Sequence, residues 1–101
     1  MPEEPRVVCF VIVTEALLEQ RLLAGLTSCG ARGWTVTAAR GEGPRNRRVS
    51  EVEGGNIRVE TLVSAEAAER IWELLAAEFF PNYAVAAWTS DVAVARHERY
   101  T

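Results

Sequence analysis

A chain of 101 residues, 49% hydrophobic and 25% charged, has the length and composition of one folded domain and is far from those of disordered proteins. Its formal net charge of -3 argues against a general binder of nucleic acid or of an anionic membrane, because both need a positive surface. No apolar run approaches the roughly 20 residues of a membrane span, and the first residues lack the positive flank of a signal peptide. We expect a single cytoplasmic domain over residues 1–101.

The two cysteines are expected to be packing residues. Cys9 lies in an apolar run and Cys29 follows a helical pattern, with no CxxC motif and no histidine beside either. Disulfide frameworks and zinc sites need more ligands at closer spacing. We therefore predict no metal site and no obligatory cofactor.

The first part of the chain predicts a strand followed by a helix. Residues 7–13 are an unbroken β-branched and aromatic run, typical of a strand buried on both faces. Thr14 can cap the following helix, with Glu15 in its first turn, and Gly30 ends it. The apolar stripe of this helix consists of Leu18, Leu22 and Leu26, widened by Leu17 and Leu23.

Two more strands and a long loop follow. Residues 34–39 alternate, with Thr35 and Thr37 on one face and Trp34, Val36 and Ala38 on the other. Residues 56–63 also alternate, with Ile57, Val59, Thr61 and Val63 on one face and Arg58, Glu60 and Leu62 on the other. The 40–55 segment between them contains four glycines, one proline and no apolar period, so it predicts a loop, and loops of that length are usually functional.

The last part of the chain predicts a second helix and a fourth strand. Ser64 is a good N-cap, and Pro81 and Asn82 end the helix. Its apolar stripe is Ala68, Ile71, Trp72, Leu75 and Phe79. Residues 83–94 form the fourth strand, and 95–101 are a charged tail.

This order of elements predicts a ferredoxin-like βαββαβ sandwich of the α+β class, with an antiparallel sheet and two helices on one face. The other face would be open and would expose Val and Trp side chains, which in soluble proteins are covered by a ligand or by further copies of the chain. We therefore predict an oligomer.

Several functions of this fold are disfavoured. RNA-recognition sheets need aromatic residues on the third strand, and 56–63 has none. Metal chaperones need a CxxC after the first strand, where Thr14 and Glu15 stand instead. Glu15 is expected to interact with the helix dipole in the first turn and not to act as a catalyst. The sequence pairs no nucleophile with a base, so we predict that the protein is not an enzyme.

The segment 40–48 predicts an anion site. Four arginines and one glutamate give it a charge of +3 within a chain of -3. Gly41 and Gly43 allow backbone N–H groups to turn towards a phosphate, and arginine binds phosphate or carboxylate with two parallel hydrogen bonds. An exposed charged loop with no ligand is the alternative interpretation.

Four stretches together resemble the PII-like signalling proteins, and among them the SbtB-type, carboxysome-associated branch. They are residues 11–15 (VIVTE), 30–36 (GARGWTV), 41–48 (GEGPRNRR) and 79–84 (FFPNYA). The resemblance implies a homotrimer with an adenine nucleotide in each cleft between subunits. It also implies that 40–55 is the T-loop, which contacts a protein target such as a membrane transporter.

The resemblance also implies a set of nucleotide-binding residues. Gly41, Gly43, Arg45 and Arg48 match the phosphate-binding run of the family. Gly33, Thr35 and Val36 match the stretch whose backbone meets the adenine and ribose. Additional candidates are Thr14 and Glu15 at the end of the first strand and Arg96 and Arg99 in the tail.

Three departures from the family pattern change what is expected of the ligand. Glu42 replaces the usual lysine and Pro44 the usual serine, which removes a positive charge, a hydroxyl and an N–H donor. Val85 replaces a glycine. These changes favour AMP, ADP or cyclic AMP over ATP.

Two hypotheses remain open. One is a signal-transduction protein of inorganic carbon metabolism that binds an adenine nucleotide, or bicarbonate, and regulates a transporter or carboxysome component through the T-loop. Such a protein would lie at the membrane only through its transporter partner. The other is a structural or adaptor trimer that binds bicarbonate, another small anion or no ligand, and docks constitutively.

Overall fold

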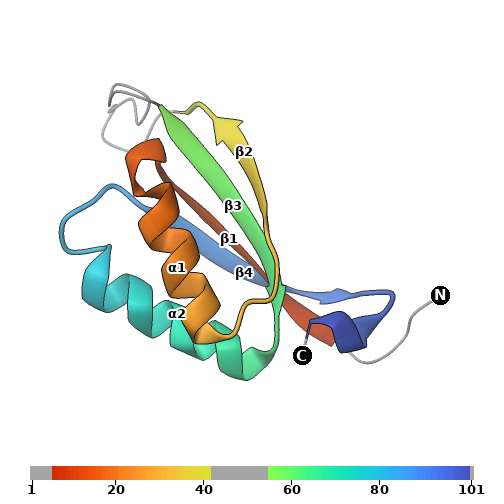
Figure 1. The fold of residues 1–101 in the computed structure, drawn as a ribbon. Helices are drawn as coiled ribbons and strands as arrows, with labels where there is room; N and C mark the ends of the chain where they lie inside the picture. Colours follow the sequence, from red (N-terminus) through yellow and green to blue (C-terminus); the bar gives the residue numbers. More distant parts are fainter. Residues whose placement is uncertain (1–5, 42–54, 101) are drawn as a thin grey trace.

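The computed structural model describes residues 6–41 and 55–100, which form four strands and two main helices (Figure 1). In chain order these are β1 (Arg6–Glu15), α1 (Glu19–Cys29), β2 (Thr35–Ala39), β3 (Asn56–Val63), α2 (Ala65–Glu78) and β4 (Ala86–Ala93). Short 3-10 helices precede α1 (Ala16–Leu18) and follow β4 (His97–Arg99). Most of the predicted loop, residues 42–54, lies outside the described residues.

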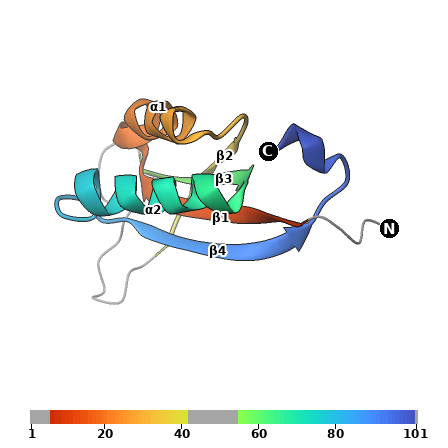
Figure 2. The same cartoon turned by 90° about the horizontal axis from the view of Figure 1, so that it is seen from below.

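The strands form one sheet in the order β2-β3-β1-β4, and every neighbouring pair is antiparallel. Both helices lie on the same face of this sheet, so the molecule has two layers (Figure 2). The predicted ferredoxin-like βαββαβ fold is confirmed.

The core lies between the sheet and the helices. β1 is central because its run of apolar residues suits a strand that is paired on both sides. Phe10 and Ile12 of β1 are fully buried under the helices, and the ring of Phe10 lies 4.6 Å from that of Trp72 on α2. On β3 the alternating residues Ile57, Val59 and Val63 join the same core.

The start of the first helix differs from the prediction. Thr14 is not an N-cap, because β1 keeps pairing with β3 as far as Glu15 and carries Thr14 inside the sheet. There its hydroxyl is buried and donates to the carbonyl of Ala84. The 3-10 turn comes next, and it leaves Leu17 70% exposed instead of in the apolar stripe.

The rest of α1 and all of α2 follow the predicted pattern. Leu22 and Leu26 are fully buried, and Gly30 ends α1 in the left-handed conformation at φ 110°. Ser64 caps α2 by accepting a hydrogen bond from the backbone N–H of Ala67. The predicted α2 stripe faces the sheet, with Ile71 and Leu75 fully buried.

The fourth strand is shorter than predicted. Tyr83 belongs to the turn after α2, where its N–H donates to the carbonyl of Phe79 and the two rings pack 6.3 Å apart. Arg21 of α1 lies over both rings and donates to the Tyr83 hydroxyl, so this turn is tied to the helical layer. Tyr83 therefore lies in the turn, and β4 begins at Ala86.

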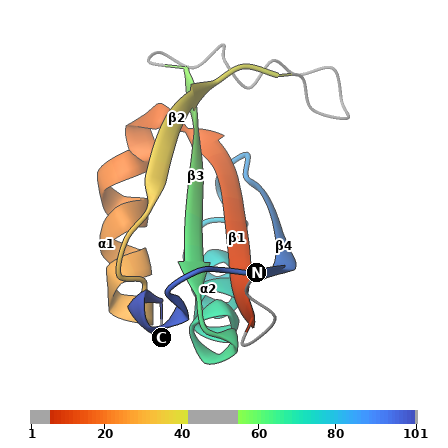
Figure 3. The same ribbon diagram turned by 90° about the vertical axis from the view of Figure 1, so that its right-hand side faces the viewer.

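The second face of the sheet carries no helix (Figure 3). The strand register places Val11 beside Trp88 and Glu60 on this open face. Trp88 is 47% exposed. The apolar residues of this face are Val7, Cys9, Val11, Val13, Leu62, Ala86, Trp88 and Val92. Val7, Cys9 and Val11, on the central strand, are buried within the chain, whereas Ala86 and Trp88 are exposed.

Candidate functional site

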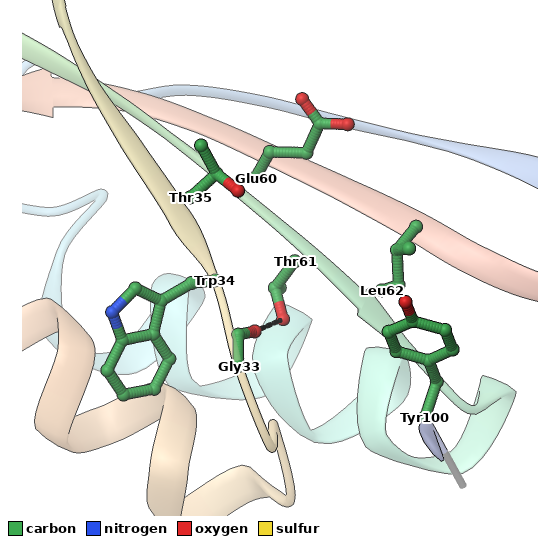
Figure 4. A pocket seen from close by; sticks show the side chains of 7 residues that line it. All are labelled: Gly33, Trp34, Thr35, Glu60, Thr61, Leu62 and Tyr100. Atoms are coloured by element: carbon green, nitrogen blue, oxygen red, sulfur yellow. Dashed lines mark hydrogen bonds between the residues drawn. The ribbon is translucent and has the colours of Figure 1, made fainter. Parts of the chain in front are cut away.

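A pocket of about 330 Å³ lies where β2 begins and β3 ends. Its lining residues come from three segments far apart in the chain: Gly33, Trp34, Thr35, Glu60, Thr61, Leu62 and Tyr100 (Figure 4). The strand register places Thr35 directly opposite Glu60. Thr35, Glu60 and Leu62 lie on the open-face side, whereas Trp34 and Thr61 lie on the helix side (Figure 4).

A short hydrogen bond fixes the backbone at the entrance to β2. The buried hydroxyl of Thr61 donates to the carbonyl of Gly33 at 2.6 Å. Gly33 precedes the first paired residue of β2, so this bond holds its position against β3. A Cβ at Gly33 would have no neighbour within 4 Å, which leaves this backbone accessible to a ligand.

The polar side of the pocket is a small network on the open face. Arg58 donates to the Oε1 atom of Glu60 at 2.9 Å, and both side chains are about two-fifths exposed. The thiol of Cys9 donates to Oε2 of the same carboxylate at 3.5 Å. Glu60 therefore has a fixed orientation and keeps acceptor capacity for a ligand N–H or O–H group.

The environment of Cys9 keeps its thiol protonated. Burial raises the pKa of the Cys9 thiol, and the hydrogen bond to Glu60 and the negative charge of Glu60 raise it further, against a smaller opposing effect of Arg58. Burial also raises the pKa of Cys29. Both cysteines are free and buried, as predicted, and neither is activated as a nucleophile.

The structure brings together some of the predicted nucleotide-binding residues. Gly33 and Thr35 both line the pocket. Val36 follows them, but its register partner is Val59, and its side chain packs against the core instead of lining the pocket.

Other candidates lie at the opposite end of the sheet. Thr14 and Glu15 end β1 beside Ile57 and Asn56, and neither lines the pocket. Glu15 is half-buried and is followed by Ala16, whose N–H donates to the carbonyl of Gly55 at 2.8 Å. These residues border the predicted T-loop.

The predicted phosphate-binding run is only partly described. Gly41 follows β2 at the end away from the pocket, and a Cβ there would have no neighbour within 4 Å. Gly43, Arg45 and Arg48 lie outside the described residues. The length of β2 separates Gly41 from Gly33, so any ligand that contacts both must lie along this strand.

The tail places its arginines near the pocket without inserting them. Arg96 adopts a left-handed conformation at φ 58°, and Arg99 ends the 3-10 helix just before Tyr100. Tyr100 lines the pocket, and neither arginine does. Both arginine side chains are exposed.

Sequence reasoning missed five of the lining residues, namely Trp34, Glu60, Thr61, Leu62 and Tyr100. The alternation of β3 already placed Glu60 and Leu62 on the face away from Ile57. Their meeting with Thr35 depends on the register between β2 and β3. No local pattern indicated where Tyr100 would lie.

Within residues 6–41 and 55–100, no three His, Cys, Asp or Glu side chains are grouped so as to hold a metal ion. In the same ranges, neither helix is long and apolar enough to cross a membrane.

Fold, pocket and sequence together define a class of protein. The chain belongs to the nitrogen regulatory protein P-II family, whose model matches residues 9–99. Proteins of this family are signalling regulators and not enzymes. The fold is consistent with the trimer that the sequence resemblance implies.

Solved structures sharpen this assignment. The chain is 46% identical to TTHA0516 of Thermus thermophilus, a protein provisionally assigned to PII-like signaling, over 95% of this chain and 96% of that one, with a TM-score of 0.82. It has the same fold as CPII of Thiomonas intermedia bound to ADP and bicarbonate, at 17% identity, 96% coverage of both chains and a TM-score of 0.85. A second CPII structure, bound to ADP, AMP and bicarbonate, matches at 17% identity over 95% of this chain and 94% of that one, with a TM-score of 0.85.

Proposed function

We propose that this protein is a cytoplasmic PII-like sensor that binds an adenine nucleotide between the subunits of a homotrimer and regulates a protein target through segment 40–55. The observation that carries the proposal is the pocket at the beginning of β2. It contains Gly33 and Thr35, which are two of the three residues that the family resemblance assigns to the adenine and ribose; the third, Val36, packs against the core.

The chemistry of the pocket suits a nucleoside. Leu62 and Tyr100 offer apolar surface, while Thr35 and the fixed carboxylate of Glu60 offer polar groups. Ligand pockets commonly combine apolar walls with a few oriented polar groups in this way. The carboxylate accepts hydrogen bonds, so it can pair with the exocyclic amino group of adenine.

The phosphates would lie towards the other end of β2. Gly41 lies at that end, and the resemblance assigns Gly43, Arg45 and Arg48 of the same run to the phosphates, where they would supply backbone N–H groups and positive charge. Arg96 and Arg99 belong to the tail at the pocket end of the strand, where they would add positive charge beside the nucleoside. Glu42 places a negative charge within this run, which disfavours a third phosphate. AMP, ADP or cyclic AMP is therefore the proposed ligand in preference to ATP.

Calorimetry with AMP, ADP, ATP, cyclic AMP and adenosine tests the proposal. We expect binding of ADP or AMP to exceed binding of ATP. Arg45→Ala should weaken ADP binding by about 1.5–3 kcal/mol, the value of a charge-assisted hydrogen bond. Adenosine binding should not change, because adenosine has no phosphate. Absence of binding to the unaltered protein at millimolar nucleotide would refute the proposal.

The target and the carbon-metabolism branch are finer parts of the same proposal. We infer an SbtB-type role in inorganic carbon use, with a bicarbonate transporter or a carboxysome component as partner. Ligand binding that favours one state of the 40–55 segment can change partner affinity by about 1–3 kcal/mol. Pull-down of such a partner should therefore depend on the nucleotide.

A structural or adaptor trimer is the second candidate. Glu42 and Pro44 favour it, because they remove a donor and a positive charge from the phosphate-binding run. CPII, with the same fold, is described as bound to bicarbonate, a smaller anion. Bicarbonate binding without nucleotide binding, together with partner capture that is indifferent to nucleotide, would favour this candidate.

A further inference from the structure

The family resemblance names Arg96 and Arg99 as candidates in the C-terminal segment but assigns no role to Tyr100. After β4 ends, residues 94–100 turn back across the ends of β1 and β3 and finish beside the start of β2 (Figure 3). The segment thereby travels from one edge of the sheet towards the other. Its last described residue, Tyr100, lines the pocket together with Gly33 and Leu62.

Backbone geometry directs Tyr100 to this place. Arg96 adopts φ 58° and ψ 50°, a left-handed conformation that non-glycine residues seldom adopt. The turn then closes through two 3.0 Å hydrogen bonds, from the N–H of Arg99 to the carbonyl of Arg96 and from the N–H of Tyr100 to the carbonyl of His97. A strained residue followed by a closed turn gives the tail a defined course.

The ring of Tyr100 occupies a distinct part of the pocket wall. It lies beside Leu62, whereas Thr35 and Glu60 lie further along the strands (Figure 4). Trp34, the other aromatic lining residue, lies on the helix side. Tyr100 is only half-buried, so its ring retains surface that a ligand can cover.

This division of the wall matches the two kinds of surface on a nucleobase. A base has flat π faces, which stack on aromatic rings, and a polar edge, which forms hydrogen bonds. The pocket volume of about 330 Å³ lies at the lower end of the range for ligand sites, which suits a nucleoside with its phosphates outside.

We propose that Tyr100 is a ligand-binding residue whose ring stacks on the base of the nucleotide, and that residues 94–100 exist to bring this ring to the pocket. This inference rests on the proposed nucleotide-binding function. Loss of base stacking on an aromatic residue weakens binding about 5- to 150-fold.

The test compares ADP binding to the unaltered protein, Tyr100→Ala, Tyr100→Phe and Glu98→Ala by calorimetry. We expect Tyr100→Ala to weaken ADP binding about 5- to 150-fold. Adenosine binding should weaken by a similar factor, because stacking does not involve the phosphates. Tyr100→Phe keeps the ring and should bind within about twofold of the unaltered protein. Glu98→Ala is the matched control, since Glu98 is exposed in the same 3-10 turn and does not line the pocket.

Proton NMR of the bound ligand separates stacking from a purely structural role. The base protons of ADP should shift upfield under the ring current, and this shift should persist in Tyr100→Phe and disappear in Tyr100→Ala. Unaltered ADP affinity in Tyr100→Ala would overturn the inference and leave the nucleotide function intact. An equal loss in Tyr100→Phe and Tyr100→Ala would overturn stacking. No ADP binding to the unaltered protein would overturn the proposed function itself.

Discussion

The two faces of the sheet differ in how much of their environment one chain supplies. On the helix-covered face, Phe10, Ile12 and Val59 are fully buried by α1 and α2. On the open face, Trp88 is 47% exposed, and the Arg58–Glu60 pair lies at the surface. The two faces of the same four strands therefore differ in how fully one chain covers them.

The largest expected effect concerns the covered face. Phe10→Ala should lower the free energy of unfolding by about 3–5 kcal/mol, because it leaves a cavity between the sheet and Trp72. Chemical denaturation followed by circular dichroism measures this loss. Phe80→Ala is the control. Because Phe80 is 42% exposed, this substitution should lower the free energy of unfolding by about 1 kcal/mol or less. Equal losses would contradict the assignment of the core.

The next effect concerns the open face. If this face is the contact between subunits, Trp88→Ala should weaken self-association by about 2 kcal/mol or more, as removal of a central aromatic residue does at interfaces. Sedimentation over a concentration series measures it. Phe80→Ala, at the end of α2, should leave association unchanged. A monomeric unaltered protein, or an unchanged association in Trp88→Ala, would show that this face does not join the subunits.

A smaller effect concerns the hydrogen bond that fixes the backbone before β2 at the pocket. Thr61 lies on the helix side, and its hydroxyl holds the Gly33 carbonyl at the entrance to β2. Thr61→Val should cost about 0.5–1.5 kcal/mol of stability, the net value of one hydrogen bond. Thermal unfolding checks this. Thr27→Val is the control. It removes an exposed hydrogen bond from the Thr27 hydroxyl to the carbonyl of Leu23 and should lower stability by less than Thr61→Val.

The smallest effect is a pH dependence of stability that is set by two cysteines. Cys9 lies on the open face of the sheet, and Cys29 lies in the helical layer. Burial raises the pKa of both Cys9 and Cys29 above their ordinary value of 9.0. The folded protein thus binds more thiol protons than the unfolded chain at alkaline pH. The contribution to stability is complete below pH 9.0 and is lost as pH rises through the folded pKa values. Denaturation at pH 7 and above pH 9 should show this decline, and a Cys9→Ser, Cys29→Ser double variant should reduce it. An unchanged slope in that variant would assign the decline to other groups.

The periodicity of apolar residues and the capping residues predicted most of the helices and strands correctly, because both signals are local in the sequence. The four-residue spacing of Leu18, Leu22 and Leu26, the cap at Ser64 and the end at Gly30 each act within one or two turns of helix. The prediction that Thr14 caps the first helix was wrong, and the reason lies outside the local sequence pattern. Its strand extends to Glu15 because β3 lies beside it, and pairing with a distant strand decided where the helix could begin.

The sequence by itself determined the order and type of the elements, the apolar stripes and the family-like stretches, since these depend on neighbours along the chain. Only the tertiary structure decided the pocket. Thr35 meets Glu60 through strand register, and Tyr100 joins them through the course of the tail after a left-handed Arg96. Contacts between residues so far apart in the chain depend on how whole strands pair, and no local spacing encodes that pairing.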